Sequence, residues 1–187
     1  MRIIAGARRG RILAYHPDLP VKPLPDRLKE SLFNILAPEV PDARVLDTYA
    51  GVGSFGLEAL SRGATHATFV ENGAAILPYL RRNIEGAGFK SAAYVAAEDV
   101  FTFLRRPHRG APYTLAFFDP PFAAVEEGRF FPDLEGVAAS LMLADRGLLI
   151  VRLPSTVPSP AAATGRPLVD ERTYGRSRVA FYQKGAP

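Results

Sequence analysis

The sequence contains no cysteine and no tryptophan, and none of its apolar runs approaches the roughly 20 residues that cross a membrane. A chain without cysteine can form no disulfide, thiolate nucleophile or cysteine-based zinc site. Its start lacks the charged segment and apolar stretch of a secretory signal peptide. With 187 residues, the chain is long enough to bury a core of its own. We therefore expect a cytoplasmic, monomeric protein built around one compact domain.

The sequence also offers no cluster of metal ligands. Its three histidines, His16, His66 and His108, are dispersed along the chain, and each is more typical of a structural or solvent-exposed residue. We therefore expect no metal site and no metal-dependent step.

Positive charge is concentrated at the two ends of the chain. Residues 1–30 carry seven Arg and Lys against three acids, and residues 166–187 carry five against two. Since the net charge of the whole chain is +4, the middle must be mildly acidic. This asymmetry indicates a polyanionic partner bound by the ends, although a basic, solvated surface would give the same composition.

Strands and helices alternate over residues 42–153, which predicts an α/β fold with a doubly wound, mostly parallel sheet. We expect strands near 44–48, 66–71, 92–97, 113–119 and 147–153. We expect helices over 25–37, 54–60 and 73–86 and from about 99, with Pro78 either kinking its helix or lying in the first turn. The rest should be an extended segment or hairpin over 1–20, a mobile Pro-rich loop over 154–167 and a closing hairpin over 168–183.

A glycine-rich turn lies between the first of these strands and the helix that begins at Ser54. Strand, turn and helix form the setting that a nucleotide-binding fingerprint requires, and the glycines allow close backbone approach and positive φ. The next strand ends at Glu71, where an acid can bind the ribose hydroxyls of an adenosine. The alternative for Glu71 is a solvated loop residue.

The most informative stretch is Asp119-Pro120-Pro121-Phe122, which follows an apolar, aromatic run typical of a buried parallel strand. Two consecutive prolines cannot continue a central strand, because neither has an N–H for the ladder. The strand must end at Asp119 in a rigid corner that holds a carboxylate, a carbonyl and an aromatic face. That set suits a planar amino group, which needs two acceptors and a ring to stack on. Asp-Pro pairs are also common in ordinary turns.

Taken together, these motifs resemble the RsmD family of S-adenosylmethionine-dependent methyltransferases. The resemblance covers nearly the whole chain, through Arg2–Gly6, Arg9–Arg11, Asp26–Asn34, Gly56–Ala64, Asn83, Tyr174–Gly175 and Phe181–Tyr182. It implies a Rossmann-like, seven-stranded sheet with an antiparallel last strand. Leu24-Pro25 stand where the family usually has two threonines, and Arg176 replaces a more usual acid. None of these departures touches the amino-binding corner, so they bear on the target nucleotide more than on the reaction.

The resemblance also implies a function and a division of the chain. The family methylates the exocyclic N2 of one guanine in 16S ribosomal RNA, and the substrate would be the RNA or an assembling 30S particle. Residues 1–41 would form a basic, RNA-contacting hairpin and helix. Residues 42–187 would form the methyltransferase domain.

Three groups of residues then acquire expected roles. The catalytic corner would comprise Asp119, Pro120, Pro121 and Phe122, with the Asp119 carboxylate and the Pro120 carbonyl accepting the amine hydrogens and Phe122 stacking on the base. S-adenosylmethionine would be held by Asp47, Ala50, Gly51, Gly53, Gly56, Glu71, Asn72, Glu98 and Asp99. RNA phosphates would be bound by Arg2, Arg8, Arg9, Arg11, Lys22, Arg27, Arg176 and Arg178. Asp99 could equally cap the helix that follows it, and the two roles can coexist.

Three other functions stay open on the sequence alone. One is methylation of another nitrogen, adenine N6 in DNA or a protein glutamine, although those families more often have Asn before the two prolines. A second is a nicotinamide oxidoreductase, which would leave the Asp-Pro-Pro-Phe corner unexplained. A third is a noncatalytic RNA-binding module.

Overall fold

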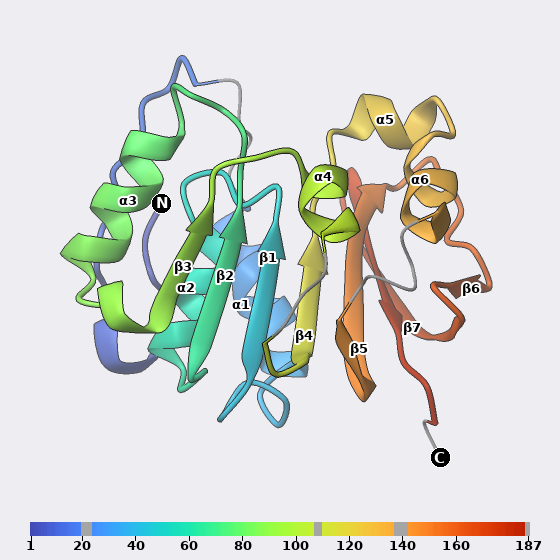
Figure 1. Cartoon of the computed structure of the whole chain (residues 1–187), viewed down its shortest axis with the longest axis horizontal. Helices are drawn as coiled ribbons and strands as arrows, with labels where there is room; N and C mark the ends of the chain where they lie inside the picture. Colours follow the sequence, from blue (N-terminus) through green and yellow to red (C-terminus); the bar gives the residue numbers. More distant parts are fainter. Residues whose placement is uncertain (20–23, 107–109, 137–141, 186–187) are drawn as a thin grey trace.

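One twisted sheet organises the computed structural model, which describes residues 1–19, 24–106, 110–136 and 142–185 (Figure 1). The sheet has the order β3-β2-β1-β4-β5-β8-β7-β6. Its strands are β1 (Arg44–Thr48), β2 (His66–Val70), β3 (Ala93–Ala96), β4 (Tyr113–Phe118), β5 (Leu143–Pro154), β6 (Ala162–Ala163), β7 (Arg166–Tyr174) and β8 (Ser177–Tyr182). The helices are η1 (Gly6–Arg8), α1 (Asp26–Ile35), α2 (Ser54–Ser61), α3 (Leu77–Gly86), η2 (Lys90–Ala92), α4 (Val100–Arg105), α5 (Phe122–Glu126) and α6 (Phe130–Gly136).

The strand directions confirm the Rossmann-like architecture. Strands β1 to β5 run parallel to one another, and β8 lies antiparallel between β5 and β7. The sequence predicts seven strands, and the described residues form eight because β6 pairs with the start of β7. That strand lies within the stretch 154–167, which reads as a loop in the sequence because proline and small residues dominate it.

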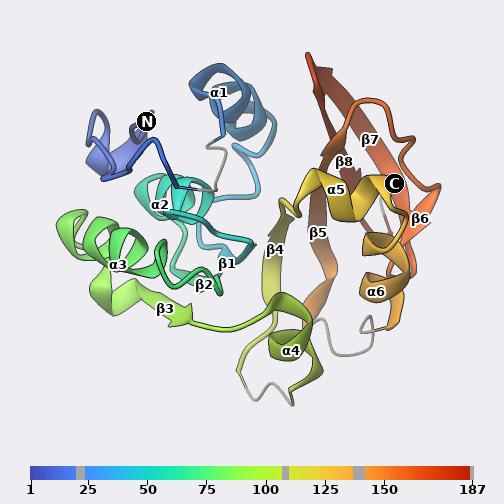
Figure 2. The ribbon, with the colours of Figure 1, turned by 90° about the horizontal axis from the view of Figure 1, so that it is seen from above.

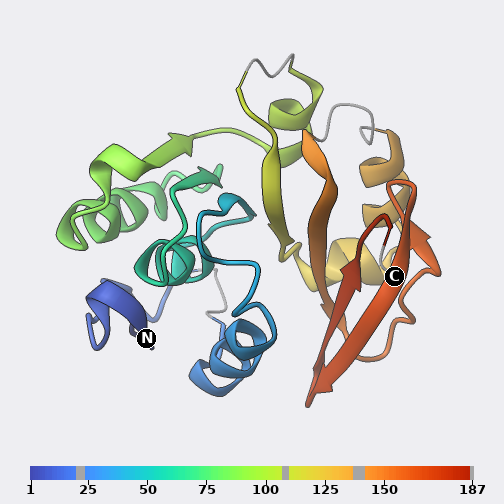
Figure 3. The ribbon, with the colours of Figure 1, turned by 90° about the horizontal axis from the view of Figure 1, so that it is seen from below.

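Helices cover both faces of this sheet, as the two views along it show (Figures 2 and 3). Successive residues of each central strand point to opposite faces, so Val45 and Phe117 join the core beneath α1, α2 and α3. Leu46 and Phe118 join the core beneath α4, α5 and α6. This double burial explains why the strands read as continuous apolar runs in the sequence.

The expected helix boundaries are largely confirmed. Helix α1 lies inside the predicted range 25–37, and α3 begins at Leu77, so that Pro78 lies in the first turn and does not kink the helix. Asp99 caps α4, because its carboxylate accepts a bond from the Thr102 N–H at 2.9 Å. Within the described part of the chain, no helix is both long enough and apolar enough to cross a membrane.

The N-terminal segment, residues 1–14, packs against α2 and α3. It contains η1 and an isolated bridge between Arg2 and Ile12, which is less regular than the hairpin that the sequence allows. The Glu58 carboxylate on α2 accepts bonds from Ile4 N–H (2.7 Å) and Ala5 N–H (3.0 Å). These bonds replace a second strand as partners of the backbone, which accounts for the irregular pairing.

Two buried side chains of opposite charge lie under this segment. Glu58 and Lys29 are both inaccessible to solvent, and their charged atoms lie 3.7 Å apart. Lys29 also donates to the Arg2 carbonyl, and Arg62 bonds Glu58 at 2.7 Å. Burial lowers the pKa of Lys29, and the Glu58 charge opposes that effect. The segment is therefore fixed to the core by a compensated charge cluster.

Candidate active site and nucleic-acid interface

The carboxyl ends of three adjacent parallel strands meet at one edge of the sheet. Strand β1 lies between β2 and β4, and Thr48 is in register with both Val70 and Phe118. The residues that follow these positions are the glycine-rich turn, Glu71 and Asp119. The topology therefore brings the predicted cofactor turn and the predicted amine corner to the same edge, where open α/β sheets bind ligands.

The glycine-rich turn has the backbone conformation that glycine favours. Gly51 and Gly53 have φ of +56° and +89°, and Tyr49 between strand and turn has +54°. A Cβ on Gly53 would be strained by the positive φ and would lie 2.7 Å from a methyl carbon of Leu80, which would have to shift. Gly56 acts differently, since a Cβ there would lie 2.4 Å from the Phe69 ring. Gly56 thus lets α2 pack on the sheet, which is the role of the third glycine in this spacing.

Glu71 is buried and holds the turn through both of its carboxylate oxygens. Oε2 accepts from Gly51 N–H at 2.8 Å, and Oε1 accepts from Gly73 N–H at 2.7 Å. The alternative of a solvated loop residue does not fit this position, where 7% of the residue is exposed. Each carboxylate oxygen can accept a further bond, so the expected ribose contact stays a prediction.

Asp47 lies at the end of β1 and is also buried. Its Oδ2 accepts from Gly56 N–H at 2.9 Å, so it holds the start of α2. Burial raises the pKa of Asp47 well above its ordinary value, and the charges of Asp119 and Glu71 act in the same direction. Three carboxyl groups, those of Asp47, Glu71 and Asp119, thus gather at this edge of the sheet.

The residues expected beside adenine lie after β2 and β3. Asn72 is exposed and comes directly after Glu71. Ala50 lies in the turn after β1, where it donates its N–H to the Val70 carbonyl at 3.0 Å. Glu98 pairs with Arg106 through two contacts of 2.9 Å, whereas Asp99 caps α4. The capping role expected for Asp99 is confirmed, and its contact with adenine stays a prediction.

The Asp-Pro-Pro-Phe corner holds an ion pair that the sequence analysis missed. Nη1 of Arg152, on β5, lies 3.0 Å and 2.9 Å from the two carboxylate oxygens of Asp119. The same guanidinium lies over the Phe122 ring, 5.0 Å from its centroid. Burial raises the pKa of Asp119, and Arg152 opposes that shift. Pro120 is buried, while Pro121 precedes the first residue of α5, so the strand ends where predicted.

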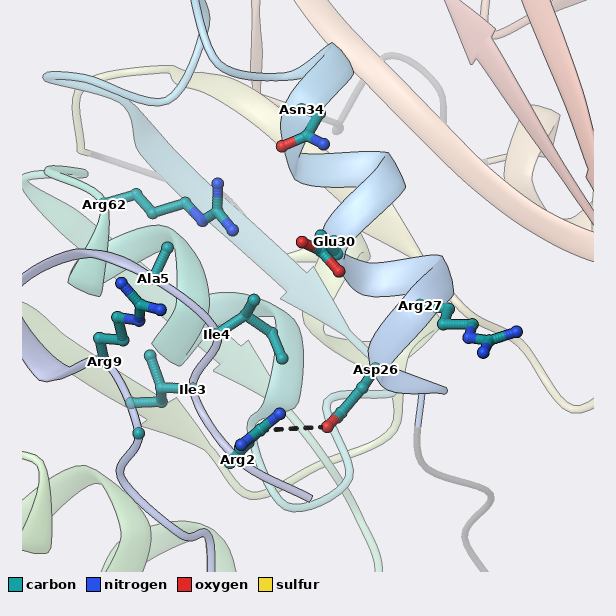
Figure 4. A pocket seen from close by; sticks show the side chains of 11 residues that line it. Arg2, Ile3, Ile4, Ala5, Arg9, Asp26, Arg27, Glu30, Asn34 and Arg62 are labelled. Carbon is teal, nitrogen blue, oxygen red and sulfur yellow. Dashed lines mark ion pairs between the residues drawn. The ribbon is translucent and has the colours of Figure 1, made fainter.

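A basic groove lies between the N-terminal segment and α1 (Figure 4). Its volume is about 510 Å³, and four arginines line it with two acids: Arg2, Arg9, Arg27, Arg62, Asp26 and Glu30. Arg2 pairs with Asp26 at 3.5 Å, and Arg62 reaches from the end of α2 toward α1. Three of the arginines expected to bind RNA therefore line one groove.

The other predicted RNA-binding residues lie in different settings. Arg11 and Arg176 are exposed, whereas Arg8 donates Nε–H to the Ala87 carbonyl at 2.7 Å. Arg178 is largely enclosed, and its guanidinium bonds the carbonyls of Val157 and Ser155 at 3.1 Å and 3.3 Å. These bonds fix the stretch after β5, so Arg178 has a structural role that its basic neighbourhood in the sequence concealed. Lys22 and His108 lie outside the described residues.

Helix α1, in the basic N-terminal region, lies next to the basic C-terminal hairpin. The hydroxyl of Tyr174, at the end of β7, lies 2.9 Å from the Ser31 hydroxyl on α1. The turn that carries Arg176 therefore lies next to the helix that carries Arg27. A contact between side chains 143 positions apart brings together two basic regions that the sequence analysis treats separately.

Comparison with known proteins places this fold and site in a family. A family model described as "Conserved hypothetical protein 95" matches residues 1–183. The Escherichia coli K12 protein named "Ribosomal RNA small subunit methyltransferase D" is 36% identical over 188 aligned residues, which cover all of this chain and 91% of the relative. The solved structure of Escherichia coli yhhF matches with a TM-score of 0.82 and 35% identity, covering 100% of this chain and 99% of that one.

A more distant structure shares the fold. SMU.776, solved in a complex with SAH, matches with a TM-score of 0.66 and 16% identity, covering 83% of this chain and 49% of that one. The full-length matches settle the relationship that the motifs imply: this chain belongs to the RsmD family.

Proposed function

We propose that this protein transfers a methyl group from S-adenosylmethionine to the exocyclic N2 amino group of a guanine in small-subunit ribosomal RNA. The observation that carries the proposal is the placement of the Asp119 corner beside the glycine-rich turn, at the carboxyl edge of the sheet. The name of the Escherichia coli relative supports the acceptor, and the SAH complex of SMU.776 supports the cofactor.

The charge of this edge fits S-adenosylmethionine, which carries a sulfonium and an ammonium group. The edge carries the three carboxyl groups of Asp47, Glu71 and Asp119 against the guanidinium of Arg152. Gly51 and Gly53 allow the backbone to approach the methionine part. Glu71 would take the ribose hydroxyls through its remaining acceptor sites. The adenine would lie near Asn72, which follows β2, and near Glu98 and Asp99, which follow β3. Ala50, in the turn after β1, would complete this part of the cofactor site.

When bound, S-adenosylmethionine supplies an electrophilic methyl group, whose bond to sulfur breaks as the new bond to nitrogen forms and whose electron pair returns to sulfur. The corner prepares the nitrogen for that displacement. The Asp119 carboxylate and the Pro120 carbonyl would accept the two amine hydrogens, which draws the nitrogen lone pair out of conjugation with the ring. Phe122 would stack on the base and fix its plane. The proton leaves the methylated amine for water, so Asp119 need only orient the amine and stabilise positive charge.

The RNA would lie across the basic groove and α1. Arg2, Arg9 and Arg27 would contact phosphates there, with Arg11 and Arg176 on the flanking surfaces. Such contacts position the RNA without reading its sequence, so the choice of guanine depends on the shape of the RNA or of a 30S particle. The target base must leave any stack to reach the corner.

Transfer of tritiated methyl groups tests this proposal directly. Purified protein is incubated with labelled S-adenosylmethionine and, separately, naked 16S RNA, 30S particles and duplex DNA, and the product nucleosides are then separated. We expect N2-methylguanosine from an RNA-containing acceptor. Label in N6-methyladenine from DNA, or no label from any acceptor despite cofactor binding, would contradict the proposal.

A further inference from the structure

Arg152 is the charged residue in an apolar stretch of β5. Leu149, Ile150 and Val151 before it and Leu153 after it are fully buried, and Arg152 is 8% exposed. A guanidinium in such a place needs bonding partners, because burying an unpaired charge costs several kcal/mol. The contacts of the Arg152 guanidinium therefore indicate its role.

Three elements converge on the Arg152 guanidinium. Nη1 bonds both oxygens of Asp119 after β4, and Nε donates to the Ser177 hydroxyl on β8 at 3.0 Å. The Phe122 ring of α5 covers the guanidinium. We propose that Arg152 is a positioning residue for methyl transfer, which holds the Asp119 carboxylate and the Phe122 ring in place for the target base. The inference rests on the proposed function.

The geometry explains how Arg152 acts without touching the base. A carboxylate on a short side chain can move with its rotamers, and a guanidinium nitrogen in contact with both oxygens ties the Asp119 carboxylate to β5. Each carboxylate oxygen has two acceptor sites, so one site per oxygen remains for an amine hydrogen. The guanidinium also lies over one face of Phe122, so the base would have to stack on the other face. Arg152 thus fixes in advance the two groups that the amine and the base would contact.

The positive charge of Arg152 is also needed to keep Asp119 ionised. Asp119 is 17% exposed, and the carboxylates of Asp47 on β1 and Glu71 after β2 lie at the same edge. Burial raises the pKa of Asp119 and so favours its protonated form, which would lose an acceptor site for the amine. Arg152 is the cation in contact with it. Without Arg152, the ionised form of Asp119 should persist only at higher pH.

Four variants test this role: Arg152→Met, Arg152→Lys, Ser177→Ala and the matched control Arg178→Met. Arg178 is a suitable control because it lies on the neighbouring strand and bonds carbonyls of the stretch after β5. For each variant, kcat and the KM values for RNA and S-adenosylmethionine are measured across the acid limb of the pH profile. Thermal melting and cofactor affinity confirm that each variant folds.

We expect Arg152→Met to lower kcat by about 10- to 100-fold, the scale of a lost positioning contact, with both KM values within a few-fold of wild type. Its acid limb should move to higher pH, because Asp119 then ionises less readily. Arg152→Lys should recover part of both effects, and Ser177→Ala should shift both in the same direction by less. Arg178→Met should leave the pH limb unchanged.

Several results would overturn the inference. A lower KM for RNA with full kcat in Arg152→Met would make Arg152 an obstruction to the base. A lower kcat with an unmoved acid limb and no recovery by Lys would make it a merely structural residue. If Arg152→Met does not fold, unmoved limbs in both Arg152→Lys and Ser177→Ala decide against the proposal. Failure of the proposed function looks different, because the wild-type protein itself would then methylate no RNA.

Discussion

The charges buried under the N-terminal segment are compensated differently from those at the carboxyl edge of the sheet. Glu58 is in contact with Lys29 and Arg62 and accepts two backbone N–H bonds. At the edge, Arg152 pairs with Asp119, whereas Asp47 and Glu71 accept bonds from backbone N–H groups. The first cluster is complete without a ligand. The second keeps an excess of negative charge where a cationic cofactor is proposed to bind.

This difference separates structural charges from functional ones. A buried acid that faces two cations gains nothing from a ligand, so its loss should damage folding. A buried acid among other acids raises the pKa of its neighbours, as it does for Asp47, and the cost of that arrangement falls when a positive ligand arrives. Variants of the Glu58 cluster should therefore lose stability, whereas variants at the carboxyl edge should lose turnover or cofactor affinity.

Removing the compensated acid should have the largest effect on stability. Glu58→Ala leaves Lys29 buried without its carboxylate and leaves two N–H groups unpaired, which should cost about 3–5 kcal/mol of unfolding free energy. Urea unfolding measures the loss. Glu30→Gln is the matched control, since Glu30 is exposed on α1, and it should change stability by less than about 0.5 kcal/mol. Equal stability of the two variants would contradict this account of the cluster.

Removing the acid at the corner should instead abolish turnover. Asp119→Ala should lower kcat by about 10²–10³-fold, the scale of a lost group that stabilises developing charge. Cofactor affinity, measured by calorimetry, should stay within a few-fold, because Asp119 acts on the amine. Unchanged turnover in a folded Asp119→Ala protein would remove this residue from the mechanism.

Glu71→Ala should weaken S-adenosylmethionine binding by about 1–3 kcal/mol. Part of that loss comes from the turn, because Glu71 also holds the N–H groups of Gly51 and Gly73. Glu71→Gln is the smaller change, since its single carbonyl can still hold one of those groups although it carries no charge. Calorimetric affinities equal to wild type in both variants would place the ribose elsewhere.

The smallest effects should come from the exposed arginines of the groove and its flank. Each arginine that neutralises a phosphate adds about 0.7–0.9 to the slope of log affinity against log salt. Replacing Arg9, Arg11 and Arg27 together should lower that slope by about 2–3, while cofactor affinity holds. Arg178→Met should leave the slope unchanged because its guanidinium is already bonded to carbonyls. An unaltered slope in a folded triple variant would mean that the RNA lies on another surface.

Local patterns in the sequence were sufficient to predict most elements of the fold. Apolar runs predict β1 to β5, and proline geometry explains both the start of α3 at Leu77 and the end of β4 at Phe118, just before Asp119. The two-residue strand β6 escapes such patterns because it depends on pairing with β7. Local signals specify elements well because they depend on residues a few positions apart.

The candidate site was predicted in part, for a related physical reason. Its turn, its acids and its corner all follow strand ends, which the topology brings together. The partner of Asp119 is 33 positions away on β5, and no periodicity connects the two residues. An arginine within an apolar strand was the available signal for Arg152, because a buried cation needs a partner. The proposed RNA-binding surface depends on the contact between α1 and the closing hairpin, which only the folded chain reveals.

The anchoring of residues 1–14 also sets an order of events during folding. Glu58 and Asn83, which hold this segment, are 54 and 69 positions away from the residues they bond. The amide of Asn83 pairs with both backbone groups of Ala14 and also donates to the Val52 carbonyl in the glycine-rich turn. A ribosome makes residues 1–14 before any of these partners exist. The part of the chain that is synthesised first can therefore be fixed only after α2, α3 and the cofactor turn have formed.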